Sequence, residues 1–442
     1  MISILLGMNT LMAEPLSLQE SLDLVATQNP EVQIARLQAD QSNLERLKVL
    51  TNLVNVQASG SWLDFGKPLD SYIIGDGSED VDCSSFDAFG FGDLCASLSE
   101  PLRVRDERIF DGSIQVAIPI SSLYSIIEGH SASQHIQEVK SLEVEQTRQR
   151  IEFSVLEIYL QTLEMQSQRD ILTDTLHRLS NHERSINAFV AQGFAHPVQA
   201  KELSHAIRQT KLGLTQLDQG FILLCKQMEL LLDLETPFEP EALPENIPLP
   251  QEASLQSNLT HRIATHQYQA AQDGAQAAMG DLIPTVALMG AATAAQGQGP
   301  FTPTSQQYLG IGVQGQLGWG HKWMTYKQRQ MDVTMAEQGL KLQEEALTIQ
   351  QAQLKQQWQH STEQIELAKE KVEIEQIKLK QAQAQFNAHQ ITTTNLLDAE
   401  SEFSEAQIVL LRSKHQSLLA QAKYQQSLDS RTVYFDYHSL NP

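Results

Sequence analysis

Residues 110–120 read FDGSIQVAIPI, and no proline occurs in the long stretch that follows, from Tyr124 to Gln192. Within the quoted segment, every second residue is apolar or glycine, namely Phe110, Gly112, Ile114, Val116, Ile118 and Ile120. The residues between them are small or polar. A period of two predicts a β-strand, and one apolar face opposite one small polar face is typical of strands that cross a bilayer.

Three other segments repeat this pattern, so the sequence predicts four strands, at about 53–65, 109–120, 283–294 and 307–319. Each has about the 9–11 residues that a tilted strand needs to cross a membrane. The segment around Thr285–Ala294 is the weakest, because nearly all its residues are small or apolar. The alternative is an ordinary antiparallel sheet packed on a helix, but the flanking helical segments carry little apolar surface with which to cover a sheet.

Four strands are too few to close a barrel, and an open strand edge does not persist in lipid. A membrane role therefore requires several copies of the chain. Three copies would supply about twelve strands, which lies within the range of bacterial outer-membrane barrels.

Two very long helices are predicted after the strand pairs, at about 124–192 and 322–388, and neither contains a proline. At a rise of 1.5 Å per residue, each would be roughly 100 Å long. Short breaks at about 193–197 and 389–394 separate them from second helices at about 198–234 and 395–427. Such breaks predict two antiparallel helical hairpins.

The order helix, strand, loop, strand, long helical hairpin thus occurs twice. We expect a signal segment at 1–13, a first structural repeat at 14–235, a proline-rich linker at 236–251, a second repeat at 252–429 and a tail at 430–442. Residues 1–13 are apolar and end in Leu11-Met12-Ala13, which resembles a signal cleavage site. A strand of the folded protein is the alternative for this segment.

The net charge of −23 disfavours nucleic acid as a partner, because phosphate binding needs a basic patch. Cys83 and Cys95 flank an acidic, glycine-rich loop and form a possible disulfide in an oxidising compartment. Cys225 lies in an apolar helical pattern and is expected to be buried. The pairs His177/His182 and His261/His266 are five residues apart, off a common helical face, so we expect no metal site. No motif for catalysis or cofactor binding is present.

Several segments resemble the TolC-like outer-membrane efflux protein family, also called outer membrane factors. They are LSLQESLDLVATQNPEVQIARLQA from Leu16, VAIPISSLYS from Val116 and TTTNLLDAESEFSEAQIVLL from Thr392. The last is the most specific. The resemblance covers about 15–428 and depends on the order, spacing and duplication of these segments.

This resemblance implies an α+β membrane protein without enzymatic activity. Its homotrimer would form one 12-stranded β-barrel, four strands per protomer, continuous with a periplasmic α-helical tunnel. It would be an exit duct of a tripartite efflux pump or type I secretion system, passively conducting substrates. Its partners would be a periplasmic adaptor protein, an inner-membrane transporter and outer-membrane lipid. The tips would dock the adaptor, through Gly193, Phe194, Ala195, His389, Gln390, Ile391 and Thr392.

Many members of the family carry two aspartates, three residues apart, after the second tip, and these form carboxylate rings at the periplasmic gate. Here the two positions are Asn395 and Asp398, so one ring remains. As an alternative, Asp398 is a solvated acid favoured by the positive end of a helix. Glycine is common where His389 stands, which suggests that the second turn differs from the first. The alternative for the whole chain is a non-pore periplasmic coiled-coil scaffold.

Overall fold

In the computed structural model, the described residues are 15–73, 82–87, 90–234, 236–242, 255–299, 302–314 and 319–428. The expected signal segment and C-terminal tail lie outside them, as does most of the expected linker. The chain divides into two compact units, and each unit draws on both halves of the sequence. Of the described residues, one unit comprises those within 15–41, 137–267 and 336–428, and the other comprises those within 42–136 and 268–335.

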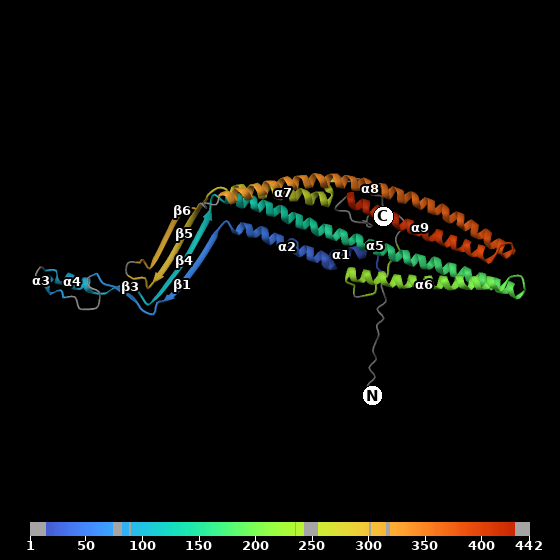
Figure 1. Ribbon diagram of the computed structural model, residues 1–442, viewed down its shortest axis with the longest axis horizontal. Coiled ribbons are helices and arrows are strands. Elements are labelled where there is room, and N and C mark those ends of the chain that lie inside the picture. Colours follow the sequence, from blue (N-terminus) through green and yellow to red (C-terminus); the bar gives the residue numbers. More distant parts are fainter. Residues whose placement is uncertain are drawn as a thin grey trace, which may run out of the picture. The chain divides into compact units, whose positions relative to one another are not determined.

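The second of these units contains a four-stranded antiparallel sheet in the order β1-β4-β5-β6 (Figure 1). The strands are β1 (Asn55–Asp64), β4 (Arg108–Pro119), β5 (Thr285–Gln296) and β6 (Ser305–Gln314). The last expected strand was extended too far, because Trp319 already begins a helix. Residues 315–318, which include Leu317, lie outside the described residues.

Register gives the sheet two chemically distinct faces, because directly opposed residues in antiparallel strands point the same way. Val56 pairs with Val116, and Val116 pairs with Gly290, which pairs with Leu309. The apolar face leaves these large side chains exposed: Val56, Trp62, Phe110, Ile114, Val116, Ile118, Leu309, Ile311 and Val313. The opposite face carries rows such as Ser59, Ser113, Thr293 and Gln306. The faces expected from the alternating pattern are therefore the faces of the sheet.

The connection between β1 and β4 was expected to be a long loop, but it has structure of its own. It contains β2 (Leu69–Ser71), α3 (Ser84–Asp87), α4 (Gly92–Ser99) and β3 (Leu102–Arg105). β2 and β3 pair in a small separate sheet, and Cys83 is joined to Cys95 by a disulfide. Alternation and helical periodicity need longer segments than these to be read, which is why the sequence did not reveal them.

The first of the two units, called the helical unit below, is built on two helical hairpins of the same dimensions. Helices α5 (Leu123–Ala191) and α8 (Trp319–Asn387) have 69 residues each. Their partners α6 (Pro197–Leu232) and α9 (Thr393–Leu428) have 36 residues each. All four helices therefore match at a constant offset of 196 residues, as the pair Leu123 and Trp319 shows. The internal duplication extends to individual helix ends.

Shorter helices, α1 (Leu18–Gln28), α2 (Pro30–Thr51) and α7 (Leu259–Gly280), complete the chain with a 3-10 turn at Leu255–Ser257. Two buried asparagines begin α2 and α7 in the same way. The Asn29 carboxamide accepts from the amides of Glu31 and Val32 and donates to the Leu231 carbonyl, 2.9 Å away. Asn258 does the same for Thr260 and His261 and donates to the Ser427 carbonyl at 3.0 Å. Leu231 and Ser427 are again 196 residues apart.

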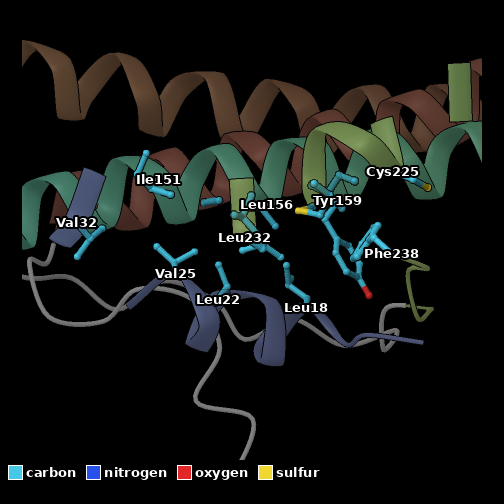
Figure 2. Close-up of a cluster of buried hydrophobic side chains, with 14 residues drawn as sticks. Leu18, Leu22, Val25, Val32, Ile151, Leu156, Tyr159, Cys225, Leu232 and Phe238 are labelled. Atoms are coloured by element: carbon cyan, nitrogen blue, oxygen red, sulfur yellow. The ribbon is translucent and has the colours of Figure 1, made fainter. Parts of the chain in front are cut away.

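A hydrophobic core forms where α1 lies against α5 and α6 (Figure 2). Ser17 begins α1 with a reciprocal capping box, in which its hydroxyl and the Glu20 carboxylate each bond the other's backbone. The core includes Leu18, Leu22, Val25, Ile151, Leu156, Tyr159, Cys225, Leu232 and Phe238. Phe238 comes from the start of the expected linker, and its ring meets that of Tyr159 edge to face at 5.9 Å. The described start of the linker is therefore anchored to the core.

Candidate functional site

The two helical tips, Gly193–Pro197 and His389–Thr394, share one backbone geometry. At the first, the Gly193 amide donates to the Val190 carbonyl and the Phe194 amide to the Phe189 carbonyl, at 3.1 and 2.8 Å. At the second, the His389 amide donates to the Phe386 carbonyl at 3.0 Å, and the Gln390 amide donates to the Gln385 carbonyl at 2.8 Å. This pair of bonds is the Schellman motif, which requires a left-handed residue after the helix.

The left-handed residue is Gly193 in one tip, with φ 77°, and His389 in the other, with φ 58°. The expectation of a different second turn was therefore wrong. A side chain in this region costs about 1–2 kcal/mol relative to glycine. The His389 ring has neighbours that offset this cost, because it lies 4.3 Å from the Phe189 ring and 5.9 Å from the Phe194 ring, centroid to centroid.

The two tips are packed together by a small apolar cluster. Its buried members come from all four long helices: Leu179, Ile186, Leu203, Ile207, Ala382, Phe386 and Leu396. Ala195 and Ile391 pack against this cluster from the turns themselves. Phe194, by contrast, is 69% exposed. The tips thus have a packed apolar base and present one large aromatic side chain to the outside.

Both helices that leave the tips begin with a side-chain cap. The His196 ring accepts from the Val198 amide at 3.2 Å, and Pro197 fills the first helical position. In the second tip, the Thr392 hydroxyl donates to the Asn395 carboxamide oxygen at 2.7 Å and accepts from the Asn395 amide at 3.4 Å. Asn395 therefore takes part in a helix cap in addition to its expected place beside the gate.

Asp398 is exposed and lies on the wall of a groove of about 650 Å³ between α6 and α9. Leu172, Thr175 and Leu179 of α5 line the same groove. The walls are related by the internal duplication: Glu202 and Asp398, His205 and Ser401, and Gln209 and Glu405 are pairs 196 residues apart. Three of these six side chains are carboxylates, so the walls are predominantly acidic.

A polar network that the sequence reasoning missed lies beside this groove and joins α5, α8 and α9. The Glu400 carboxylate, 1% exposed as a residue, accepts from Arg178 at 2.7 Å, His182 at 3.1 Å and Gln383 at 3.1 Å. Thr175 and Ser404 bond each other at 2.8 Å next to it. The available signal was spacing, because Glu400 interrupts the apolar positions Leu396 and Phe403 on one face of α9.

Burial by itself would raise the pKa of Glu400. The hydrogen bonds from His182 and Arg178, together with the charge of Arg178, outweigh burial, and they hold the pKa of this carboxyl below its ordinary value. Glu400 is therefore a charged, fully bonded anchor between the two hairpins.

Two of the histidines that were considered as metal ligands have hydrogen-bonding roles. His182 contacts Glu400, and His261 lies 3.1 Å from the Glu344 carboxylate. Among the described residues, no three His, Cys, Asp or Glu side chains gather closely enough to hold a metal ion. Within the same part of the chain, no helix is both long and apolar enough to cross a membrane.

Solved structures of outer-membrane channels have the same fold. The chain matches CusC, studied for transmembrane channel formation, with a TM-score of 0.77 and 13% identity, over 93% of this chain and 92% of CusC. It matches the outer-membrane channel OprN at 0.74 and 14%, over 93% and 90%. It matches the outer-membrane protein VceC of Vibrio cholerae at 0.74 and 12%, over 92% and 96%.

This chain has the TolC-like fold. The expected fold class is confirmed at the level of the protomer: long helical hairpins joined to a four-stranded antiparallel sheet. No protein-family model matches the sequence, and no curated protein matches it. At 10–14% identity, the shared feature is the arrangement of elements rather than the residues of the site.

Proposed function

We propose that this protein is an outer-membrane exit duct that passively conducts substrates delivered from the inner membrane. The exposed apolar face of the β-sheet is the observation that carries the proposal. Ile311, Val313 and Leu309 are each more than 70% exposed in the single chain. An apolar face of this size needs a cover, and hydrocarbon lipid is the cover that also explains the small polar side chains on the other face.

The free strand edges support assembly into a closed barrel. β1 and β6 each have a neighbour on one side only, and unpaired backbone groups are costly in a lipid environment. The number of copies follows from the resemblance, in which three chains make twelve strands.

The internal duplication supports the same assembly in the helical unit. Within the chain, Arg178 of α5 contacts Glu400 of α9. The residues 196 positions away are Ile374 on α8 and Ser204 on α6, and Ile374 is 52% exposed. If the contact is repeated around a ring, the α8 face of one copy packs on the α6 face of the next.

Exposed apolar side chains lie along both of these helices. Those on α8 include Leu342, Ile349, Leu367, Ile374 and Ile377, and those on α6 include Val198, Leu212, Leu223 and Leu230. Long helices gain their stability mainly by packing such stripes. A ring of copies would bury both.

We further propose that the duct works in a tripartite efflux pump or a type I secretion system. The tips would dock a periplasmic adaptor protein, through Gly193, Phe194, Ala195, His389, Gln390, Ile391 and Thr392. Asp398 would supply the carboxylate of the periplasmic gate. Phe194 supports the docking role, because it is a large aromatic side chain that is exposed next to a packed apolar cluster.

The lipid-facing assignment is tested by substitutions on the two faces of the sheet, with Val116 and Gln115 as neighbours on one strand. Val116→Arg and Ile311→Arg place a charge in lipid, which costs about 2–4 kcal/mol at the bilayer midplane. We expect loss of heat-stable, SDS-resistant oligomers from the outer-membrane fraction. Gln115→Arg, on the opposite face of the same strand, is the control and should assemble normally and conduct in planar bilayers.

The non-pore scaffold makes the opposite prediction. A scaffold would be released from membranes by carbonate, and Val116→Arg and Gln115→Arg would behave alike. Either result would overturn the proposed duct.

A further inference from the structure

The connection between β5 and β6 folds back over the polar face of the sheet. Its described residues are Gly297–Gly299 and Thr302–Thr304, here called the strap. The Gln298 carboxamide donates to the Asp111 carboxylate. Register places Asp111 on the polar face, opposite Ser61 on one side and Ala295 on the other. The strap is thus tied to that face by a side-chain bond.

Two glycines allow the strap to lie close to the backbone of residues 104–108 in the same chain. Gly297 and Gly299 have φ values of 86° and 79°. A Cβ at Gly297 would lie 2.3 Å from the Arg108 carbonyl oxygen, and one at Gly299 would lie 2.5 Å from that of Val104. The Asp106 amide also donates to the Gly297 carbonyl at 2.8 Å. Backbone contacts therefore hold the strap together with the Gln298 side chain.

Together the strap and the sheet enclose a recess of about 320 Å³. Oxygen-bearing side chains line it, including Ser59, Ser113, Thr293, Gln298, Thr302 and Gln306. Asp111 is its only charged lining residue among those that the structure describes, and no Lys, Arg or His lines it. The nearby Arg108 is paired with Asp64 at 3.3 Å. A carboxylate among neutral oxygens favours a hydrated cation and repels an anion.

We propose that Asp111 and the strap form a cation-selective constriction at the end of the sheet away from the long helices. The direction follows from the chain, since β4 begins at the strap and its other end leads into α5. The inference rests on the proposed function, because the polar face lines a lumen only in a closed barrel. It assigns selectivity to Asp111 at the outer mouth, separate from the helical tips.

The first test is the reversal potential of purified oligomers in planar bilayers under a KCl gradient. Asp111→Asn should lower the cation-to-anion permeability ratio by about twofold or more, as expected for a ring of charges in a pore. Asp64→Asn is the matched control. It removes the same charge close by, but from a residue already paired with Arg108, and should leave the ratio unchanged. An unchanged ratio in Asp111→Asn would overturn the inference.

The second test concerns the strap. Gln298→Ala should raise single-channel conductance and accelerate amide hydrogen exchange at Asp106, because the side-chain tie is lost. Gly299→Val should increase the conductance and the exchange rate further. Formation of oligomers by this variant would show that it still folds. Faster exchange at unchanged conductance would also reject the constriction. A wild-type protein that forms no channel would instead refute the proposed function, so the two failures are distinguishable.

Discussion

The two helical tips have one backbone and different chemistry. Both close a 69-residue helix with the same pair of hydrogen bonds, and both lead into a 36-residue helix. Yet the left-handed position is Gly193 in one and His389 in the other. The backbone of a turn can thus be retained while its key residue changes, provided that new contacts offset the strain.

A second difference between the hairpins lies two residues beyond Asp398. Glu400 anchors α9 to α5 through Arg178 and His182, whereas the residue 196 positions earlier is Ser204, which has no charge to offer. The first hairpin therefore lacks the ionic anchor of the second. The duplicated backbone is supported by one strongly polar contact that is not itself duplicated.

Removing this anchor should have the largest effect on the helical unit. Glu400→Leu leaves Arg178 and His182 without their partner, and breaking a buried ion pair costs about 3 kcal/mol or more. Ser204→Leu, at the equivalent place on α6, is the control and should cost far less. Urea unfolding in detergent, followed by tryptophan fluorescence, measures both. Equal losses of unfolding free energy in the two variants would show that the Glu400 contacts stabilise the protein no more than Ser204 does.

The same anchor predicts a pH dependence. Because the folded-state pKa of Glu400 is below its ordinary value of 4.5, its contribution to stability is present above that value. The contribution is lost as the pH falls through the lowered folded-state pKa. We expect wild type to lose more stability than Glu400→Gln between pH 5 and more acidic conditions. Parallel pH profiles of the two proteins would contradict this assignment.

The two capping asparagines should behave as a matched pair. Asn29→Ala and Asn258→Ala each remove a helix cap and a bond to a distant carbonyl, a loss of about 2 kcal/mol. Asn258→Ala should cost slightly less, because the Ser427 carbonyl keeps the Gln351 side chain as a donor at 2.7 Å. The free energy of unfolding compares them. A loss of stability in only one variant would show that the two asparagines share their hydrogen-bond geometry but contribute unequally to the free energy of unfolding.

Substitutions at the two left-handed positions should change the stability of the protein by a smaller amount. Gly193→Val should destabilise the protein by about 1–2 kcal/mol, since a branched side chain is strained at φ 77°. His389→Gly relieves strain but loses the ring contacts with Phe189 and Phe194, so its net effect should lie within about 1 kcal/mol of zero. A thermal melt distinguishes these results. A large loss in His389→Gly would mean that the ring contacts dominate.

Sequence patterns predicted what depends on repeated spacing. Alternation predicted the two faces of β4, and the absence of proline predicted the long helices. Helix α1 ends before the Asn29-Pro30 step and α2 begins at Pro30, because a proline disfavours the helical conformation of the residue before it. These features are set by local rules that a single segment contains.

Other features depend on which segments meet, and spacing does not contain that information. Glu400 acquires its role only because Arg178, more than 200 residues away, lies beside it. The left-handed turn at His389 depends on the rings of Phe189 and Phe194 from the other hairpin. The groove likewise combines α5, α6 and α9. Two of the carboxylates on its walls, Glu202 and Asp398, are counterparts at the offset of 196, which only the helix bounds reveal.

The final prediction concerns these two carboxylates and has the smallest effect on stability. Both are exposed, so Asp398→Asn and Glu202→Gln should leave the free energy of unfolding nearly unchanged. If Asp398 forms the periplasmic gate, Asp398→Asn should lower cation selectivity and weaken block by multivalent cations in planar bilayers. Glu202→Gln, on the opposite wall of the groove, should alter neither.

Asn395→Asp should strengthen block by adding a second carboxylate near the first, at some cost to the Thr392 cap. Unchanged reversal potentials in Asp398→Asn and Asn395→Asp would leave Asp398 as a wall residue of the groove. A response in Glu202→Gln alone would move the gate from the second hairpin to the first.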